Sequence, residues 1–517
     1  MLPSNSYFRL SLATADQSRQ VDQQTIESFG IPGETLMEIA GNRTADIIRS
    51  DFPAGSTILV VCGKGNNAGD ALVAARLLLD DGYRIILVPA LGLEGWSDDA
   101  SRNLKRLRRL AEGMGTELDI RTEWNVSDDP ARTADLIVDG IFGTGLRSET
   151  RAPVSDVIHQ INSCGKPVYA LDLPSGLHCD TGERLGHTVK ADKTLQFGVR
   201  KLGCYIGQGP NFCGKRLLLD LPFPNRYKSG ISVRLLDETL VPEDLLAKRG
   251  ADDRSSLHKY NNGVVHVIGG SAGLTGAPLY AAKAAWALGM GAVTLIHPSQ
   301  WLQTMDVQAP SLIKHPVGPA NSVSFTEKDS GQVLDLISEK KGVTVIGPGI
   351  GRDRQTLAFV AKVIRKSEGP IIVDADGLLA VAENPEAFTE RKDPGSVILT
   401  PHPGELKNLA GTAFANDSER LQMTRSLAQR LGCNIVSKGN PVMVHCPRPN
   451  QTLITGYDTS VFARAGFGDI LAGQIAAFMT HDSDTITGCE LALLHGYQHI
   501  STLASRGKLF PEPSDFT

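Results

Sequence analysis

Oxygen-bearing and acidic side chains follow three apolar runs in the first half of the chain. Gly63 to Asp70 comes after a run ending at Val61, and similar loops occupy Asp139 to Leu146 and Asp172 to Gly176. Because ligands in open α/β sheets collect at the carboxyl ends of the strands, we expect one crevice to receive the side chains of Asn66, Asn67, Asp139, Asp172 and Ser175. Such oxygen donors suit an alkali or alkaline-earth cation better than zinc, and a glycine-rich turn before a helix suits a phosphate.

Each of these loops also has a plainer interpretation. An isolated aspartate after a strand is usually a cap or a turn former, and a glycine-rich turn often does no more than pack a helix on a strand. As a dinucleotide fingerprint the first loop is weak, because the next predicted strand, Arg84 to Val88, ends in Pro89-Ala90 without an acid for a ribose. The occurrence of three such loops together nevertheless favours a binding site.

A second candidate site is Ala465-Gly466-Phe467-Gly468-Asp469, which runs into an apolar helix predicted over Ile470 to Met479. Glycines at a helix N-terminus form an anion site for a transferring phosphoryl group, and Asp469 could take a proton from the attacking hydroxyl. The alternative is an N-capping aspartate after a glycine turn. The functional interpretation is favoured by companion loops at Gly269 to Pro278, Gly347 to Gly351, Asp374 to Leu378, Thr400 to Glu405 and Lys438-Gly439.

These loops need strands and helices to hold them. Short β-rich runs alternate with helical patterns, which predicts βαβ units, parallel sheets and two doubly wound α/β domains. The expected strands are 57–61, 85–88, 136–138 and 168–171 in the first half, and 264–268, 293–296, 343–346, 371–373, 397–399, 435–436 and 442–444 in the second. Leu221 to Asp252 carries prolines and mixed charges without a period, so we place the boundary near residue 230, between domains 1–228 and 232–517.

Composition and charge exclude several classes of protein. The chain has 517 residues, with 52 Lys+Arg against 57 Asp+Glu and a net charge of −5, so no basic field is available for a nucleic acid or an anionic membrane. The arginine-rich segment Arg102 to Arg109 is interpreted as a solvated helix face in preference to a nucleic-acid patch. Residues 1–19 lack the apolar core of a signal peptide, no membrane span is visible, and the 8 cysteines form no C-x-x-C pair, which predicts a cytoplasmic protein.

The motifs of both halves resemble one known family. In the first half, Leu36-Met37-Glu38 with Ala40-Gly41, Asn66 to Asp70, Asp139 to Leu146 and Asp172 to Gly176 resemble the NAD(P)H-hydrate epimerase domain. In the second half the Gly-x-Gly-Asp loop is similar to that of the ribokinase-like superfamily, and Gly269 to Pro278 and Thr400 to Glu405 resemble the ADP-dependent NAD(P)H-hydrate dehydratases. The whole chain is thus similar to the bifunctional NAD(P)H-hydrate repair enzymes, which implies a Rossmann-like N-terminal domain and a ribokinase-like C-terminal domain.

For the first domain the resemblance implies a potassium ion (K⁺) bound by Asn67, Asp139 and Ser175. Asp172 is the candidate acid or base, because the hydroxyl-bearing carbon of a hydrated nicotinamide ring can be inverted by reversible loss and return of its hydroxyl with the help of a proton shuttle. The residues expected to contact the hydrated dinucleotide are Asn66, Asn67, Ala68, Gly69, Asp70, Gly143, Thr144, Gly145, Leu146, Arg147, Ser148, Glu149 and Asp172.

For the second domain the resemblance implies ADP as co-substrate and Asp469 as catalytic base, with Mg²⁺ expected to accompany the nucleotide. Phosphoryl transfer suits a dehydration, because hydroxide is a poor leaving group and phosphate is a good one. The residues expected to contact the hydrate are Ala277, Gly349, Gly351, His402, Pro403, Gly404, Glu405, Leu406, Lys407, Asn408 and Asp469. Those expected to contact the nucleotide are Lys438, Gly439, Asn440, Pro441, Val442, Thr459, Ser460, Val461, Phe462, Ala463, Arg464, Ala465, Gly466, Phe467 and Gly468.

Some positions depart from the family's pattern. Ala68 replaces a commoner glycine, Phe467 stands where Thr or Ser is usual, and Asn440-Pro441-Val442 replaces a run of small and hydroxyl-bearing residues. Backbone contacts to an anion survive such changes, so they bear on nucleotide preference or rate and leave the phosphate site in place. His402, between two prolines, is either a packing or capping residue or one that acts in catalysis.

The function that the resemblance implies is repair of damaged nicotinamide coenzymes. The first domain would interconvert the R and S hydrates of NADH and NADPH, and the second would convert the S hydrate back to the coenzyme while ADP becomes AMP and phosphate. Two alternatives remain, namely a small-molecule kinase that releases a stable phosphorylated product, and a first domain that binds a nucleotide without catalysis. The expected partners are small-molecule substrates and further copies of the chain in a homo-oligomer, with no nucleic acid and no membrane.

Overall fold

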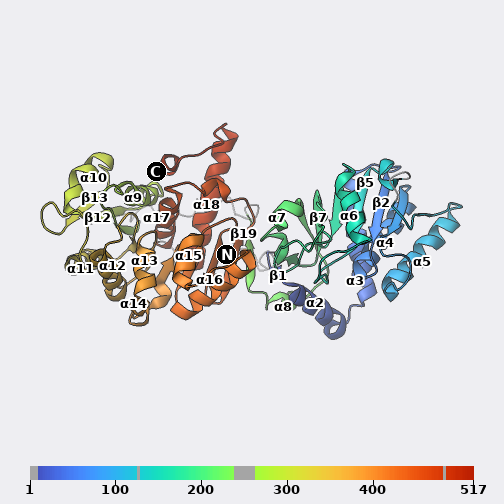
Figure 1. Ribbon diagram of the computed structural model, residues 1–517, viewed down its shortest axis with the longest axis horizontal. Helices are drawn as coiled ribbons and strands as arrows, with labels where there is room; N and C mark the ends of the chain where they lie inside the picture. The colour runs from blue at the N-terminus through green and yellow to red at the C-terminus, as the bar shows by residue number, and fades with distance from the viewer. Residues whose placement is uncertain (1–9, 125–128, 238–261, 481–484) are drawn as a thin grey trace, which may run out of the picture. The chain divides into compact units, whose positions relative to one another are not determined.

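The computed structural model describes residues 10–124, 129–237, 262–480 and 485–517, and the chain divides into two compact units (Figure 1). The first unit comprises Met1–Val233 with Asn416–Ser418, and the second comprises Arg234–Ala415 and Glu419–Thr517. The division at residue 233 lies close to the boundary expected near residue 230, while residues 238–252 of the expected connecting segment lie outside the described residues. Each unit has its own sheet and its own core.

The first unit is built on a seven-stranded parallel sheet with the order β4-β3-β2-β5-β6-β7-β9. From β2 the next strands, β3 and β4, are added on one side of the sheet, and from β5 the later strands are added on the other side. The strand order therefore reverses between β2 and β5. This topology confirms the predicted Rossmann-like class. The strands are β2 (Thr57–Cys62), β3 (Arg84–Pro89), β4 (Asp119–Ile120), β5 (Leu136–Gly140), β6 (Val168–Leu171), β7 (Lys193–Phe197) and β9 (Lys215–Leu219), besides a separate parallel pair of β1 (Leu12–Ala13) and β8 (Arg200–Lys201).

Helices cover both faces of this sheet because its buried strands carry apolar side chains on both sides. Ile58 and Val60 of β2 pack with residues of α3, α4 and α5, whereas Leu59 and Val61 pack with residues of α6. A π-helical turn at Thr25–Phe29 follows α2. The α-helices of the unit are α2 (Ala15–Gln24), α3 (Gly33–Asp51), α4 (Asn66–Asp80), α5 (Asp98–Gly113), α6 (Val154–Ser163) and the short α7 (Gly209–Phe212) and α8 (Asn225–Lys228).

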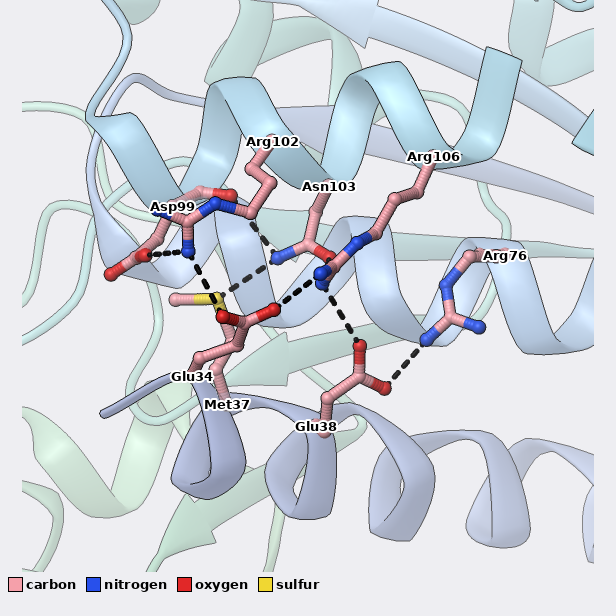
Figure 2. Close-up of polar contacts among 8 residues, drawn as sticks. All are labelled: Glu34, Met37, Glu38, Arg76, Asp99, Arg102, Asn103 and Arg106. Carbon is pink, nitrogen blue, oxygen red and sulfur yellow. Dashed lines mark hydrogen bonds and ion pairs between the residues drawn. The ribbon is translucent and has the colours of Figure 1, made fainter. Parts of the chain in front are cut away.

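The arginine-rich segment forms α5, and two of its arginines form ion pairs with glutamates of α3 (Figure 2). Arg102 Nη1 lies 3.2 Å from Glu34 Oε2, and Arg106 pairs with both Glu34 and Glu38 of α3. Glu38 also pairs with Arg76 of α4, at 2.6 Å. The solvated-face interpretation is therefore incomplete, because two of the arginines bind α5 to α3 across the helix interface.

The second unit contains a ten-stranded sheet with the order β10-β19-β18-β17-β16-β15-β14-β11-β12-β13. Neighbours from β13 to β17 pair in parallel, and β18 pairs antiparallel with both β17 and β19. The strands are β10 (Val233–Leu236), β11 (Val264–Ile268), β12 (Ala292–Pro298), β13 (Ile313–Val317), β14 (Val343–Ile346), β15 (Ile371–Val373), β16 (Val397–Leu399), β17 (Asn434–Ser437), β18 (Met443–Cys446) and β19 (Gln451–Thr455).

Two apolar clusters lie on opposite faces of this sheet. Val265 and Val345 pack with α9, α17 and α18, while Ile268 and Ile346 pack with α11, α12, α13, α15 and α16. Within the described residues, no helix is both long and apolar enough to cross a membrane. The helices are α9 (Gly276–Ala287), α10 (Leu302–Gln308), α11 (Ser330–Glu339), α12 (Arg354–Lys366), α13 (Gly377–Glu383), α14 (Glu386–Thr389), α15 (Pro403–Ala410), α16 (Asp417–Leu431), α17 (Phe467–Met479) and α18 (Thr485–Ser505).

The close packing of α17 on α9 yields a stability prediction. A Cβ added to Gly473 would lie 2.1 Å from the carbonyl oxygen of Ala281, so Gly473→Ala must displace a backbone and should cost at least about 2 kcal/mol. In Gly331→Ala, the matched control on α11, the added Cβ meets nothing within 4 Å. The control should leave stability unchanged or raise it by up to about 1 kcal/mol. Calorimetric melting of both variants checks this, and equal melting temperatures would contradict it.

Candidate active sites

The carboxyl ends of β2, β5 and β6 open onto a cavity of about 760 Å³ in the first unit. The loop after β2 passes close to the loop after β5 because Gly63 has no side chain, and a Cβ there would lie 2.0 Å from the carbonyl oxygen of Ile141. The chain then enters α4 directly. Of the predicted residues, the cavity is lined by Asn66, Asn67, Asp70, Gly143, Thr144, Gly145, Leu146, Arg147, Ser148 and Asp172.

A buried oxygen network joins the loops after β5 and β6. Asp139 is fully buried, and its carboxylate accepts from the Ser175 amide over 2.8 Å and from the Ser175 hydroxyl over 2.7 Å. Burial raises the pKa of Asp139 to about 6, against the opposing effect of these hydrogen bonds. Asn67 Nδ2 lies 3.0 Å from the carbonyl oxygen of Phe142 and 3.2 Å from that of Leu171. Asn67, Asp139 and Ser175 therefore lie on adjoining loops, but Asp139 and Ser175 are buried beneath the cavity lining, so the expected single crevice does not receive all five side chains.

Asp172 stands at the end of β6 in a strained backbone conformation, with φ of 67°. Its Oδ1 accepts from the Phe197 amide over 3.1 Å and forms an ion pair with Lys201 of β8. The Lys201 side chain is only 1% exposed, and its Nζ also donates to the Phe197 carbonyl over 2.9 Å. Lys201 thus fixes the Asp172 carboxylate at the cavity wall.

Two further carboxyl groups line the same cavity, Asp22 from α2 and Asp70 from the first turn of α4. Burial raises the pKa of Asp22, and the negative charge of Asp172 adds to this while Lys201 opposes it. Burial, Asp172 and Asp22 raise the pKa of Asp70 well above its ordinary value. The cavity therefore combines one buried lysine with several acidic groups, and the pKa is raised in two of them, Asp22 and Asp70.

Three of the predicted contact residues do not line this cavity as the structure describes it. Ala68 is fully buried in the core, and Gly69 faces Met37, whose Cε would lie 2.5 Å from an added Cβ. Glu149 follows Ser148 in the loop but is not among the residues that line the cavity. Sequence reasoning in turn missed Asp22 and Lys201. The available signal was weak, because Lys201 follows Arg200 in a segment whose other residues are mostly apolar, and its partner Asp172 lies at the end of another strand.

In the second unit, the ends of β15, β16 and β17 and the start of α17 meet at a cavity of about 550 Å³. The buried Asp374 carboxylate follows β15, and its Oδ1 accepts from the Thr400 hydroxyl over 2.7 Å. Lys438 Nζ, after β17, lies 2.7 Å from the same oxygen. Asp469 lines the cavity from the first turn of α17.

Charges in this cavity are strongly coupled. Burial and the negative charge of Asp374 raise the pKa of Asp469 to about 7, although Lys438 acts in the opposite direction. Burial lowers the pKa of Lys438, but the carboxylates of Asp374 and Glu405 outweigh it and raise the value overall. Burial likewise raises the pKa of Glu405. Asp469 thus exchanges its proton near neutral pH beside a lysine that stays charged.

The glycine loop opens the start of α17 to this cavity. Gly466 occupies the N-cap position with φ of 94°, and no described side chain caps the helix there. Gly468 lies over the buried ion pair, since a Cβ on it would be 3.1 Å from Lys438 Nζ. Backbone N–H groups at a helix N-terminus, with a lysine beside them, form an anion site.

The departures from the family's pattern have structural explanations. The Phe467 ring is 3% exposed and packs edge-to-face on Phe462, with centroids 5.6 Å apart. Asn440 Nδ2 donates to Asp458 Oδ1 over 2.8 Å, and its Oδ1 accepts from the Thr459 amide over 3.1 Å. Asn440 therefore joins the loop after β17 to the loop after β19, which both line the cavity.

His402 caps α15 with its ring. Its Nδ1 accepts from the amides of Gly404 and Glu405 over 3.0 and 3.3 Å, while Glu405 Oε2 accepts from the His402 amide. The side chain is 58% exposed at the cavity rim. The capping interpretation of His402 is thus supported by its contacts, and no catalytic geometry is required to explain the residue.

Most of the residues predicted for the second site line its cavity, namely His402, Pro403, Glu405, Lys438, Gly439, Asn440, Val442, Thr459, Ser460, Phe462, Ala463, Arg464, Ala465, Gly466, Phe467, Gly468 and Asp469. Those outside its lining are Ala277, Gly349, Gly351, Gly404, Leu406, Lys407, Asn408, Pro441 and Val461. Leu406, for instance, is fully buried in the core. Sequence reasoning named the loop from Asp374 to Leu378 only as a companion of this site and assigned no role to Asp374, Gln474 or Phe516, which also line the cavity.

The Lys201–Asp172 pair yields a stability prediction. Lys201→Met should destabilise the first unit by about 3 kcal/mol, because it leaves a largely buried carboxylate without its cation. Arg147→Met, the control, removes an exposed ion pair with Asp180 and should cost less than about 1 kcal/mol. Calorimetry measures both, and the double variant Lys201→Met with Asp172→Leu should recover part of the loss. Equal effects of the two single variants would refute a special role for this pair.

Two protein-family models match different parts of the chain. A family model described as YjeF-related protein N-terminus matches residues 33–203, and one described as NAD(P)H-hydrate dehydratase matches residues 265–508. A solved structure of an ADP/ATP-dependent NAD(P)H-hydrate dehydratase from Bacillus subtilis is 22% identical, covers 51% of this chain and 90% of that one, and has a TM-score of 0.41.

Full-length relatives give the clearest similarity. A protein from Salinibacter ruber named bifunctional NAD(P)H-hydrate repair enzyme is 33% identical, covering 93% of this chain and 90% of its own. A protein of the same name from Moorella thermoacetica is 32% identical, covering 96% of this chain and 93% of its own. With this identity sustained along about nine-tenths of each chain, the chain belongs to the family of bifunctional NAD(P)H-hydrate repair enzymes.

Proposed function

We propose that the protein repairs hydrated NADH and NADPH with two active sites on one chain. The first unit exchanges the R and S hydrates, and the second dehydrates the S hydrate while ADP is converted to AMP and phosphate. The observation that carries this proposal is that each cavity presents an aspartate beside a lysine that is itself paired with a carboxylate, Asp172 with the buried Lys201 and Asp469 near the partly buried Lys438. The first pair lies where parallel strands end, and the second lies where strand ends meet the start of α17.

At the first site, Asp172 moves the proton that epimerisation requires. The hydroxyl leaves as water after it is protonated, the C–O bond breaks, and the ring nitrogen forms a double bond to the carbon. Water then adds to the other face and gives up a proton to the same group, so the reaction is balanced. Lys201 holds the carboxylate in place, and the loop Gly143 to Ser148 lines the space for the dinucleotide.

A potassium ion fits the donor set of Asn67, Asp139 and Ser175. All three offer oxygen, and the Asn67 amide lies beside two backbone carbonyls, at 3.0 and 3.2 Å. The oxygen and nitrogen of a side-chain amide are assigned from their hydrogen-bond partners. If a cation replaced the present partners, the amide would rotate by about 180° and its oxygen would join these two carbonyl oxygens as a ligand. The ion would place a positive charge beside the buried Asp139. It would also hold the loops after β2, β5 and β6 at fixed distances from one another.

At the second site, Asp469 takes the proton of the substrate hydroxyl as that oxygen attacks the β-phosphorus of ADP, and AMP leaves. The C–O bond of the phosphorylated intermediate then breaks, phosphate departs, and loss of a proton from the neighbouring carbon restores the dihydropyridine ring. The N–H groups of the glycine loop and Lys438 hold the transferring phosphoryl group. Mg²⁺ would arrive with the nucleotide phosphates, since it usually binds through them.

Recovery of NADH absorbance from a mixture of both hydrates tests the whole proposal, with K⁺, Mg²⁺ and ADP present. Asp469→Ala should lower the rate by about 10²- to 10⁴-fold, whereas Asp172→Ala should repair only the S hydrate already present. Asp156→Ala, exposed on α6, is the control and should match the unaltered protein. A stable phosphorylated product would support a kinase instead, and unchanged epimer exchange in Asp172→Ala would remove that residue from the mechanism.

The pKa of Asp469 near 7 sets the pH dependence of the second step. A base must be deprotonated, so the dehydration rate should rise with pH and reach half its plateau near pH 7. Lys438→Met removes a positive charge that lowers this pKa. The pH at which the rate reaches half its plateau should therefore rise by about one unit, in addition to any loss of rate. Lys366→Met, exposed in the last turn of α12, should leave the pH dependence unchanged. An unchanged pH dependence in Lys438→Met would contradict the assignment of Asp469.

A further inference from the structure

The segment after α18 folds back onto the beginning of α17. Arg464 Nη1 donates to the carbonyl oxygen of Pro511 over 2.9 Å. Pro513 packs on the glycine loop, because a Cβ added to Gly466 would lie 3.0 Å from Pro513 Cγ. The 3₁₀ turn Pro513–Phe516 is therefore seated directly against the anion site.

Phe516, at the end of this turn, is 5% exposed and belongs to an aromatic cluster. Its ring centroid lies 5.5 Å from that of Phe467 and 4.4 Å from that of His499. Phe462 packs edge-to-face on Phe467, at 5.6 Å. Phe467, which stands in the glycine loop where a hydroxyl residue is usual, thus has the turn as its packing partner.

The cavity of the second unit has two chemically different parts. One part carries the charged groups Asp374, Lys438 and Asp469 beside the glycine loop. The other is lined by apolar side chains, namely Phe462, Phe467, Ile470, Leu493 and Phe516. Because Phe467 lies between the two glycines of the loop, the apolar part begins next to the phosphate site. A nucleoside diphosphate has this same division, with charged phosphates and a flat, weakly polar base.

We propose that Phe516 is a nucleotide-binding residue, whose ring forms with Phe462 and Phe467 the wall that receives the base of the diphosphate. This inference rests on the proposed function, since it takes the phosphates to lie at Gly466 to Gly468. Aromatic side chains bind nucleobases by stacking and by excluding water, and the larger purine gains more from this than a pyrimidine. The turn Pro513–Phe516 is then a part of the active site that no glycine-loop motif includes.

Calorimetric titration of the full chain with ADP and Mg²⁺ tests the inference. Phe516→Ala should weaken ADP binding about tenfold and reduce the preference for ADP over UDP, while the KM of the hydrate stays unchanged. Phe510→Ala is the matched control, because that ring is 80% exposed and lines no described cavity. Phe516→Tyr, which keeps an aromatic ring, should retain most of the affinity. Melting temperatures establish that each variant is folded.

Three results would overturn the inference. ADP binding by Phe516→Ala that equals that of the unaltered chain would show that the ring does not contact the base. An increase in the KM of the hydrate with ADP affinity unchanged would assign the apolar wall to the other substrate. Equal losses of affinity for both ligands, with a lower melting temperature, would show a structural role only. In each case repair by the unaltered protein would still stand, whereas failure of that protein to bind ADP would overturn the proposed function as well.

Discussion

A lysine paired with a carboxylate, fully buried in the first unit and largely buried in the second, organises each of the two cavities. Lys201 pairs with Asp172 in the first unit, and Lys438 pairs with Asp374 in the second. Removing a charge from water is costly, so such a lysine persists only where a carboxylate and further hydrogen-bond partners compensate it. The Phe197 carbonyl completes this set for Lys201. Each lysine consequently determines the position of nearby acidic groups and modifies their affinity for protons.

Close approach of backbones makes these positions possible. Gly63 lets the loops after β2 and β5 touch, and Gly140 lets α4 lie on β5, where an added Cβ would come within 2.7 Å of the Ala71 Cβ. In the second unit Gly468 brings the start of α17 over the lysine pair, and Gly473 seats the same helix on α9. These glycines therefore matter because they lack a side chain. A Cβ at any of them would push apart the elements that form the site.

Much of the fold was predictable because its signal is local. Apolar β-rich runs such as Thr57 to Val61 became strands, since a parallel sheet buried on both faces requires continuous apolar segments. The loops after β5 and β6 also indicated that Asp139 and Asp172 would lie at the same edge of the first sheet, and the glycine loop separately indicated the place of Asp469 at the start of α17. The interpretation of α5 was incomplete, however, because the pairing of Arg102 and Arg106 with α3 joins residues more than 60 positions apart.

The sequence by itself determined the α/β class, the two-unit organisation and the family, because strand periodicity and glycine-loop spacing are properties of short segments. Only the tertiary structure brought Lys201 to Asp172 and Phe516 to Phe467. It also decided that His402 caps α15 and that Ala68 and Gly69 face the core. These outcomes depend on burial and on contacts between distant segments, and the free energy of a buried charge or ring is set by its surroundings in space.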